Sequence, residues 1–79
     1  MYNFLNDEFN SLTEKLKDIK EKIKENQNKR NIATREYHKT KIIDEKTREE
    51  LVKERELLKQ EERKINIKLK AISELLTNL

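Results

Sequence analysis

The side chains of this chain that could do chemistry form neither a catalytic set nor a metal-binding set. Cysteine is absent and His38 is the sole histidine in 79 residues, so a structural zinc site lacks its usual ligands. Glycine is also absent, and both phosphate-cradling loops and nucleophile elbows require it. The sequence shows no nucleophile–base pair and no carboxylate pair in an apolar setting. We therefore expect a protein that is not an enzyme and has no metal or cofactor.

Five charged positions in the middle of the chain resemble, in order and type, those of the all-helical chorismate mutases. They are Arg30, Lys39 or Lys41, Asp44, Arg48 and Glu49. Those enzymes carry an Arg on a long first helix, then a Lys, then an Asp followed by an Arg-Glu pair, and they clamp a dianion electrostatically. Here the step from Asp44 to Arg48 is one residue longer, the glycine-bearing loop is missing, and no sequence remains for a third helix. We attribute the likeness to charged helices in general and do not expect that activity.

The composition predicts an all-α chain outside the membrane. Charged residues make up 44% of the sequence and glycine and proline are absent, which disfavours hairpin strands and is typical of exposed helices. The first residues lack the pattern of a signal peptide. No stretch approaches the roughly 20 apolar residues of a membrane span. We expect a cytoplasmic protein, and the richness in Lys, Asn and Ile is typical of an AT-rich genome, such as that of a low-GC bacterium or its phage.

Apolar residues recur every three or four positions in both halves of the chain, which is the spacing of a coiled-coil seam. The seam is strict in the first half, and from Leu51 it returns in the same heptad phase. In the second half Leu57, Leu69, Leu75 and Leu76 widen it to about a third of the helix circumference. A stripe of this width predicts contact with more than one neighbouring helix. The predicted seam consists of Tyr2, Leu5, Phe9, Leu12, Leu16, Ile19, Ile23, Leu51, Leu58, Ile65, Leu69, Ile72 and Leu76.

The two apolar-rich halves are nearly equidistant from residue 40, which predicts an antiparallel helical hairpin. Folding the chain there brings position i opposite position 81 − i, approximately, so that Ile23 faces Leu58. Asp44 or Thr47 can cap a second helix, and Thr47–Glu50 fits a capping box. We expect one domain over 1–79, with a first helix over about 3–38, a turn over about 39–44 and a second helix over about 45–78. Two such hairpins would dock as a homodimeric four-helix bundle.

Two other architectures fit the same pattern. A single unbroken helix, up to about 118 Å long at 1.5 Å per residue, would make the same contacts in an antiparallel dimer. A turn at Asn26–Asn31 would instead pair Ile23 with Ala33 and leave residues 65–79 without a partner in the chain. Closure across a short turn near residue 40 has a low entropic cost, which favours the hairpin.

Asn26 and Arg30 interrupt the apolar seam of the first half. Asn26 takes a d position and Arg30 the following a position. A polar residue buried in a seam can set the register and orientation of the helices at a cost in stability. The alternative is that the helices fray at this point and both side chains reach water.

The stretch Asn26–Lys41 holds five cations and one acid, and in the hairpin it lies next to the turn. The residues that could contact a partner or a phosphate are Lys29, Arg30, Arg35, Tyr37, His38, Lys39 and Lys41. Basic side chains with an interleaved aromatic ring can hold phosphate and stack on a base. Charge runs of this kind are more commonly solvated helix faces.

These features predict stoichiometric binding of another protein by a small dimeric adaptor, assembly factor or inhibitor, encoded by a phage or mobile element. In this interpretation an apolar helix face docks a partner helix and charged flanks set specificity. One alternative is binding of nucleic acid or an anionic ligand through the basic segment 26–41. Another is a structural rod or filament unit.

Overall fold

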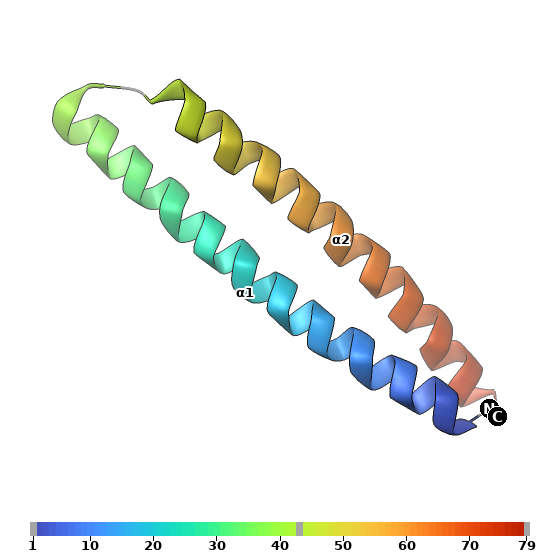
Figure 1. Cartoon of the computed structure of the whole chain (residues 1–79). Helices are drawn as coiled ribbons and strands as arrows, with labels where there is room; N and C mark the ends of the chain where they lie inside the picture. Colours follow the sequence, from blue (N-terminus) through green and yellow to red (C-terminus); the bar gives the residue numbers. More distant parts are fainter. Residues whose placement is uncertain (1, 43, 79) are drawn as a thin grey trace.

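The computed structural model describes residues 2–42 and 44–78, and the side chains of all of these except Tyr2. Helix α1 spans Tyr2–Thr40 and helix α2 spans Glu45–Thr77. The helices pack against each other as an antiparallel hairpin that measures 59 Å by 14 Å by 14 Å (Figure 1). The predicted all-α hairpin is confirmed. The alternative of a turn at Asn26–Asn31 is wrong, because α1 runs through it without a break.

The core of the hairpin is a single row of side chains from each helix. Leu12 and Ile19 of α1 are buried, as are four residues spaced seven apart on α2, namely Leu51, Leu58, Ile65 and Ile72. Around them pack the partly buried Leu5, Phe9, Leu16, Ile23, Leu69 and Leu76. Full burial of one Leu or Ile contributes roughly 1.5–3 kcal/mol. All the predicted seam residues with described side chains therefore lie in or beside the intrachain core.

The core stops well before the turn. Asn26 and Leu51 are the buried residues nearest to it on the two helices, and no described residue between 34 and 50 is buried. We call this segment, residues 34–42 and 44–50, the tip. Its helices are therefore held by local hydrogen bonds and by the packing of the rest of the hairpin.

The C-terminal end of α1 is closed by a left-handed residue that is not glycine. Lys41 has φ 59°, and its N–H donates to the carbonyl of Tyr37 at 2.7 Å. This is the hydrogen bond of an αL cap, which glycine usually provides. The left-handed region costs a residue with a Cβ atom about 1–2 kcal/mol. The chain thus reverses direction without glycine or proline, at the expense of local strain.

Asp44 is the N-cap of α2. Its carboxylate accepts hydrogen bonds from the Thr47 hydroxyl at 2.7 Å and the Thr47 N–H at 3.2 Å. These bonds, the hydroxyl bond first, lower the pKa of Asp44 from its ordinary value of 3.8. Thr47 lies inside the first turn of α2 and is not the cap, so of the two predicted capping residues Asp44 takes the role.

Replacing Lys41 with glycine is expected to stabilise the hairpin by about 0.5–1 kcal/mol, because relief of the αL strain exceeds the added backbone entropy of the unfolded chain. Urea denaturation followed by circular dichroism measures this change. Lys39→Gly is the matched control, and it should destabilise by about 1 kcal/mol because Lys39 is helical. Destabilisation by both variants would show that Lys41 is not strained.

Asp44→Ala is expected to lower the melting temperature at pH 7, and Asp44→Asn to lower it less, because asparagine keeps an acceptor for the N–H of Thr47. The carboxyl pKa is depressed in the folded state, so its contribution is present above the unfolded value near 3.8 and is lost as the pH falls through the folded value. The deficit of Asp44→Ala should therefore shrink as the pH falls below the unfolded value near 3.8. A deficit that stays constant below this value would contradict the ionised cap.

Candidate interaction surfaces

The predicted contact residues of the basic segment are exposed, with one exception. Lys29, Arg35, Tyr37, His38, Lys39 and Lys41 are exposed, whereas Arg30 is partly buried. The Tyr37 and His38 rings lie 5.8 Å apart between centroids. The Lys41 ammonium lies 5.9 Å from the centroid of the Tyr37 ring, within the range of a cation–π contact. The structure thus brings the aromatic pair and a cation together beside the turn.

Arg30 turns away from this group toward the helix seam. Its Nε donates to Oδ1 of Asn26 at 2.9 Å, and its Nη2 donates to Oε1 of Gln27 at 2.6 Å. A planar guanidinium held by two such bonds is fixed in orientation. Of the cations predicted to meet an anion, Arg30 therefore has a structural role within α1.

Asn26 is buried in the seam and bonds the two helices together. It is fully buried, and its Nδ2 donates to the Leu51 carbonyl at 2.9 Å and to Oε1 of Glu54 at 3.1 Å. No buried polar atom of the described side chains lacks a partner. An unpaired amide at this depth would cost about 1–3 kcal/mol. The sequence left open whether Asn26 is buried or frayed, and in the structure it is buried.

The Asn26 bonds also show how the two helices are aligned. The predicted pairing places Asn26 opposite Arg55, and in the structure its amide contacts Leu51 and Glu54. On α2, Leu51 precedes Arg55 by about one helical turn, and Glu54 immediately precedes Arg55. Both interhelical acceptors of the amide therefore lie beside the predicted partner. The sequence signal that was available is the Asn26–Arg30 pair, an i, i+4 spacing that allows the two side chains to bond.

More large hydrophobic side chains are exposed than are buried. Six hydrophobic residues form the core, whereas eight others on the described part of the chain are exposed, namely Phe4, Ile32, Tyr37, Ile42, Val52, Leu57, Ile67 and Leu75. Leu57 and Leu75, which widen the predicted stripe of the second half, are 61% and 54% exposed. Leu69 and Leu76, from the same stripe, pack against the core. Intrachain packing thus covers only part of the apolar stripe of α2.

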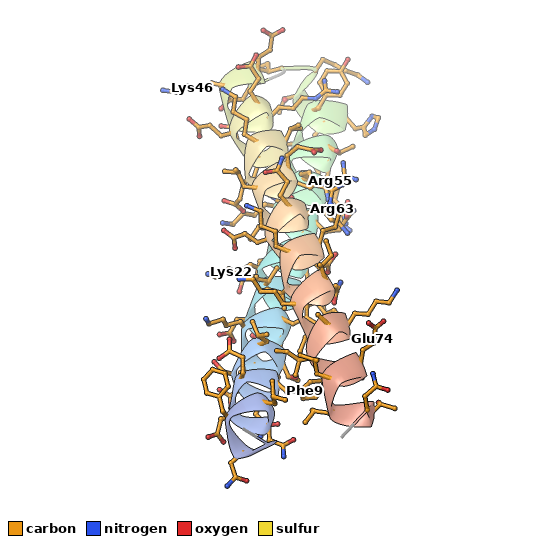
Figure 2. The ribbon with its side chains drawn as sticks, turned by 90° about the vertical axis from the view of Figure 1, so that its right-hand side faces the viewer. Phe9, Lys22, Lys46, Arg55, Arg63 and Glu74 are labelled. Carbon is orange, nitrogen blue, oxygen red and sulfur yellow. The ribbon has the colours of Figure 1, made fainter. Side chains whose placement is uncertain are left out.

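The two flanks of α1 differ in charge pattern. On one flank Glu8, Lys15, Asp18, Lys22 and Glu25 alternate in sign at helical spacing. The other flank is the row of residues at positions 6, 10, 13, 17, 20, 24, 27, 31 and 34. It carries three lysines and no acid. Figure 2 shows Lys22 of the first flank and Lys46 on one side of the hairpin, and Arg55, Arg63 and Glu74 of α2 on the other. Helix α1 therefore has one flank of balanced charge and one flank whose charged residues are all lysines.

The hollow beside the middle of α1, of about 420 Å³, is shallow and is lined by Thr13, Leu16, Lys17, Lys20, Glu21 and Lys24. Within residues 2–42 and 44–78, no three His, Cys, Asp or Glu residues gather where they could hold a metal ion. Nor is any helix in this part of the chain both long enough and apolar enough to cross a membrane.

No protein-family model matches the chain, and comparison with curated proteins and with solved structures finds no significant similarity. Inference about function therefore depends on the physical properties of these surfaces.

Asn26→Leu is expected to raise the free energy of unfolding by about 1 kcal/mol, because added apolar burial exceeds the lost hydrogen bonds. It should also give mixed species on a sizing column, since the seam no longer favours one register. Asn28→Leu, which adds the same group at an exposed position of α1, is the matched control and should give the species of the unmodified protein. A single unchanged species for Asn26→Leu would rule out a register role.

Proposed function

We propose that the protein is a small non-enzymatic interaction module that dimerises into a four-helix bundle and binds another protein, as an adaptor, assembly factor or inhibitor. The observation that supports this is the excess of exposed over buried large hydrophobic side chains, eight against six in the described residues. A chain of 79 residues with one thin core has little stability of its own, and it contains no disulfide or metal to compensate. Association is the remaining way to cover this apolar surface.

The dimer interface of the proposal lies on the outer side of α2. Leu57 and Leu75 are exposed there, with Ala71 at helical spacing between them. The charged residues of the same stripe segregate, since Glu50, Glu54 and Glu61 come first and two lysines follow. Antiparallel docking of two copies of α2 in the register that places Leu57 of one copy beside Leu75 of the other covers these exposed side chains. Apolar contacts then lie at both ends of the interface.

The partner contact of the proposal is the tip. No described residue between 34 and 50 is buried, and Ile42 in the turn and Ile32 just before the tip are 73% and 55% exposed. Apolar side chains set among cations are typical of a surface that packs against a helix and selects it by charge. An antiparallel dimer through α2 would leave two tips accessible at opposite ends of the bundle.

The double variant Leu57→Glu/Leu75→Glu is expected to convert the dimer to a monomer, because each interface would then bury four unpaired carboxylates. Size-exclusion chromatography with light scattering measures the mass. The control Gln60→Glu/Asn66→Glu adds the same charge at exposed polar positions of α2 and should stay dimeric. A mass of one chain for the unmodified protein at micromolar concentration would reject the dimer.

A second candidate function, binding of nucleic acid or another polyanion, is favoured by the group around Tyr37. The Lys41 ammonium and the His38 ring both lie within 6 Å of the Tyr37 ring centre, and Arg35 and Lys39 are exposed nearby. Such a group can neutralise phosphates and stack on a base.

The triple variant Lys29→Ala/Arg35→Ala/Lys39→Ala tests this function by fluorescence anisotropy with a labelled single-stranded oligonucleotide. If the basic segment binds nucleic acid, the affinity should fall steeply with salt, and the variant should reduce the slope of log K against log salt by about 2. Lys53→Ala/Lys64→Ala/Lys70→Ala on α2 is the control. Equal losses in the two variants would mean nonspecific attraction only.

A further inference from the structure

We propose that the acid-free flank of α1 is a docking groove for an acidic amphipathic helix of another protein. The groove is centred on Asn10, Thr13, Lys17, Lys20, Lys24 and Gln27, which we call the basic edge. This surface is separate from the tip and from the exposed stripe of α2. The inference therefore goes beyond the proposed function, because it adds a second binding surface and states the chemistry of its ligand.

The basic edge is positively charged, because its three lysines outnumber the one acid, Glu21, that lines the same hollow. Lys17, Lys20 and Lys24 are exposed and span about 10 Å along the helix at 1.5 Å per residue. The one ion pair within 4.0 Å among the described residues joins Lys59 and Glu62 of α2. The other flank of α1 also carries three lysines, Lys15, Lys22 and Lys29, but acids alternate with them. The two flanks thus have equal numbers of lysines, but the basic edge keeps a net positive charge when Glu21 is counted, whereas the charges of the other flank balance.

An apolar row lies directly beside the basic edge. Leu12 and Ile19 are 4% and 7% exposed, whereas Phe9, Leu16 and Ile23, from the neighbouring row of the same seam, are only partly buried. Each of the three partly buried residues is followed four positions later by a polar residue, namely Thr13, Lys20 or Gln27. These polar residues therefore lie along the edge of the apolar row. Leu16 lines the shallow hollow of about 420 Å³ together with Thr13, Lys17, Lys20, Glu21 and Lys24. The groove therefore has an apolar floor and a rim on which lysines outnumber acids.

The spacing of the floor favours a helix over a nucleic-acid strand. Its three apolar residues recur every seven positions, or about 10.5 Å along α1, which is the repeat of a heptad seam on a helix lying alongside. A phosphodiester chain would use the lysines but would leave the apolar row exposed. The Asn10 and Thr13 side chains at the edge of the groove can form hydrogen bonds with polar side chains on a docked helix. They are uncharged and so do not repel the charged residues of that helix. Two helices with an unpaired groove of this kind accept a third helix as a three-helix bundle.

The probe for this proposal is a synthetic four-heptad helix with leucine at its seam positions and glutamate on both flanks. Binding to the full chain is measured by fluorescence anisotropy of the labelled peptide, and light scattering on the same samples reports the dimer. The glutamate helix should bind at least about tenfold more tightly than the same helix with lysine on its flanks, and this preference should weaken with salt. This comparison uses the unmodified protein, so it does not depend on the folding of any variant.

Two charge-reversed variants then locate the site. Lys17→Glu/Lys20→Glu/Lys24→Glu should weaken binding of the glutamate helix by at least about tenfold and shift the preference toward the lysine helix. Lys15→Glu/Lys22→Glu/Lys29→Glu changes the same number of charges on the other flank and should leave the affinity within about twofold. Helicity and melting temperature are recorded for both.

Three results would overturn the proposal. The first is equal affinity of the unmodified protein for the two peptides, and the second is equal loss of binding in the two variants. The third is binding of a DNA duplex that the basic-edge variant abolishes, in the absence of binding to the glutamate helix, which would assign the lysines to phosphate. Loss of the dimer with binding retained would instead count against the α2 interface alone.

Discussion

The register of the two helices is the constraint on which the rest of the structure depends, and the buried amide of Asn26 bridges the helices in that register. Apolar contacts between two heptad seams tolerate sliding by one heptad, since one leucine packs much like the next. In the observed register the amide donates to the Leu51 carbonyl and the Glu54 carboxylate, so this burial leaves no polar group unpaired. Arg30 holds the amide from its own helix and so reduces its freedom before α2 arrives. The alignment of the core layers and the position of the turn follow from this one register.

The tip can be highly exposed because Asn26 closes the core ahead of it. Between Asn26 and Leu51 no described residue is fully buried, and only Arg30 and Ala33 are partly buried. The turn is held by the Lys41 and Asp44 caps. Each cap satisfies backbone groups locally and needs no tertiary packing. The molecule therefore separates a packed rod, which carries stability, from a polar end that can vary in sequence without loss of the fold.

The pattern of apolar residues was sufficient to predict the hairpin, its turn and the residues of its core. It did not predict how each helix is rotated about its own axis, because that depends on both seams at once. Rotation decides that Leu12 and Ile19 are buried while Phe9 and Leu16 remain at the edge. It also decides that Leu57 faces outward while Leu69 packs inward. The basic segment could be located in advance, but the turning of Arg30 toward Asn26 and Gln27 of its own helix could not, since it depends on how deeply Asn26 is buried against α2.

The start of α1 and the end of α2 lie side by side at the end of the hairpin opposite the tip (Figure 1). This arrangement has a mechanical consequence. A force applied through these two ends would open the hairpin like a zipper, one layer at a time, beginning with the layers of Leu5, Ile72 and Leu76. The Asn26–Leu51 bond would be the last of the buried contacts to carry load. A force applied between the tip and either end would instead shear all the layers together, so the same core would resist the two directions of pull very differently.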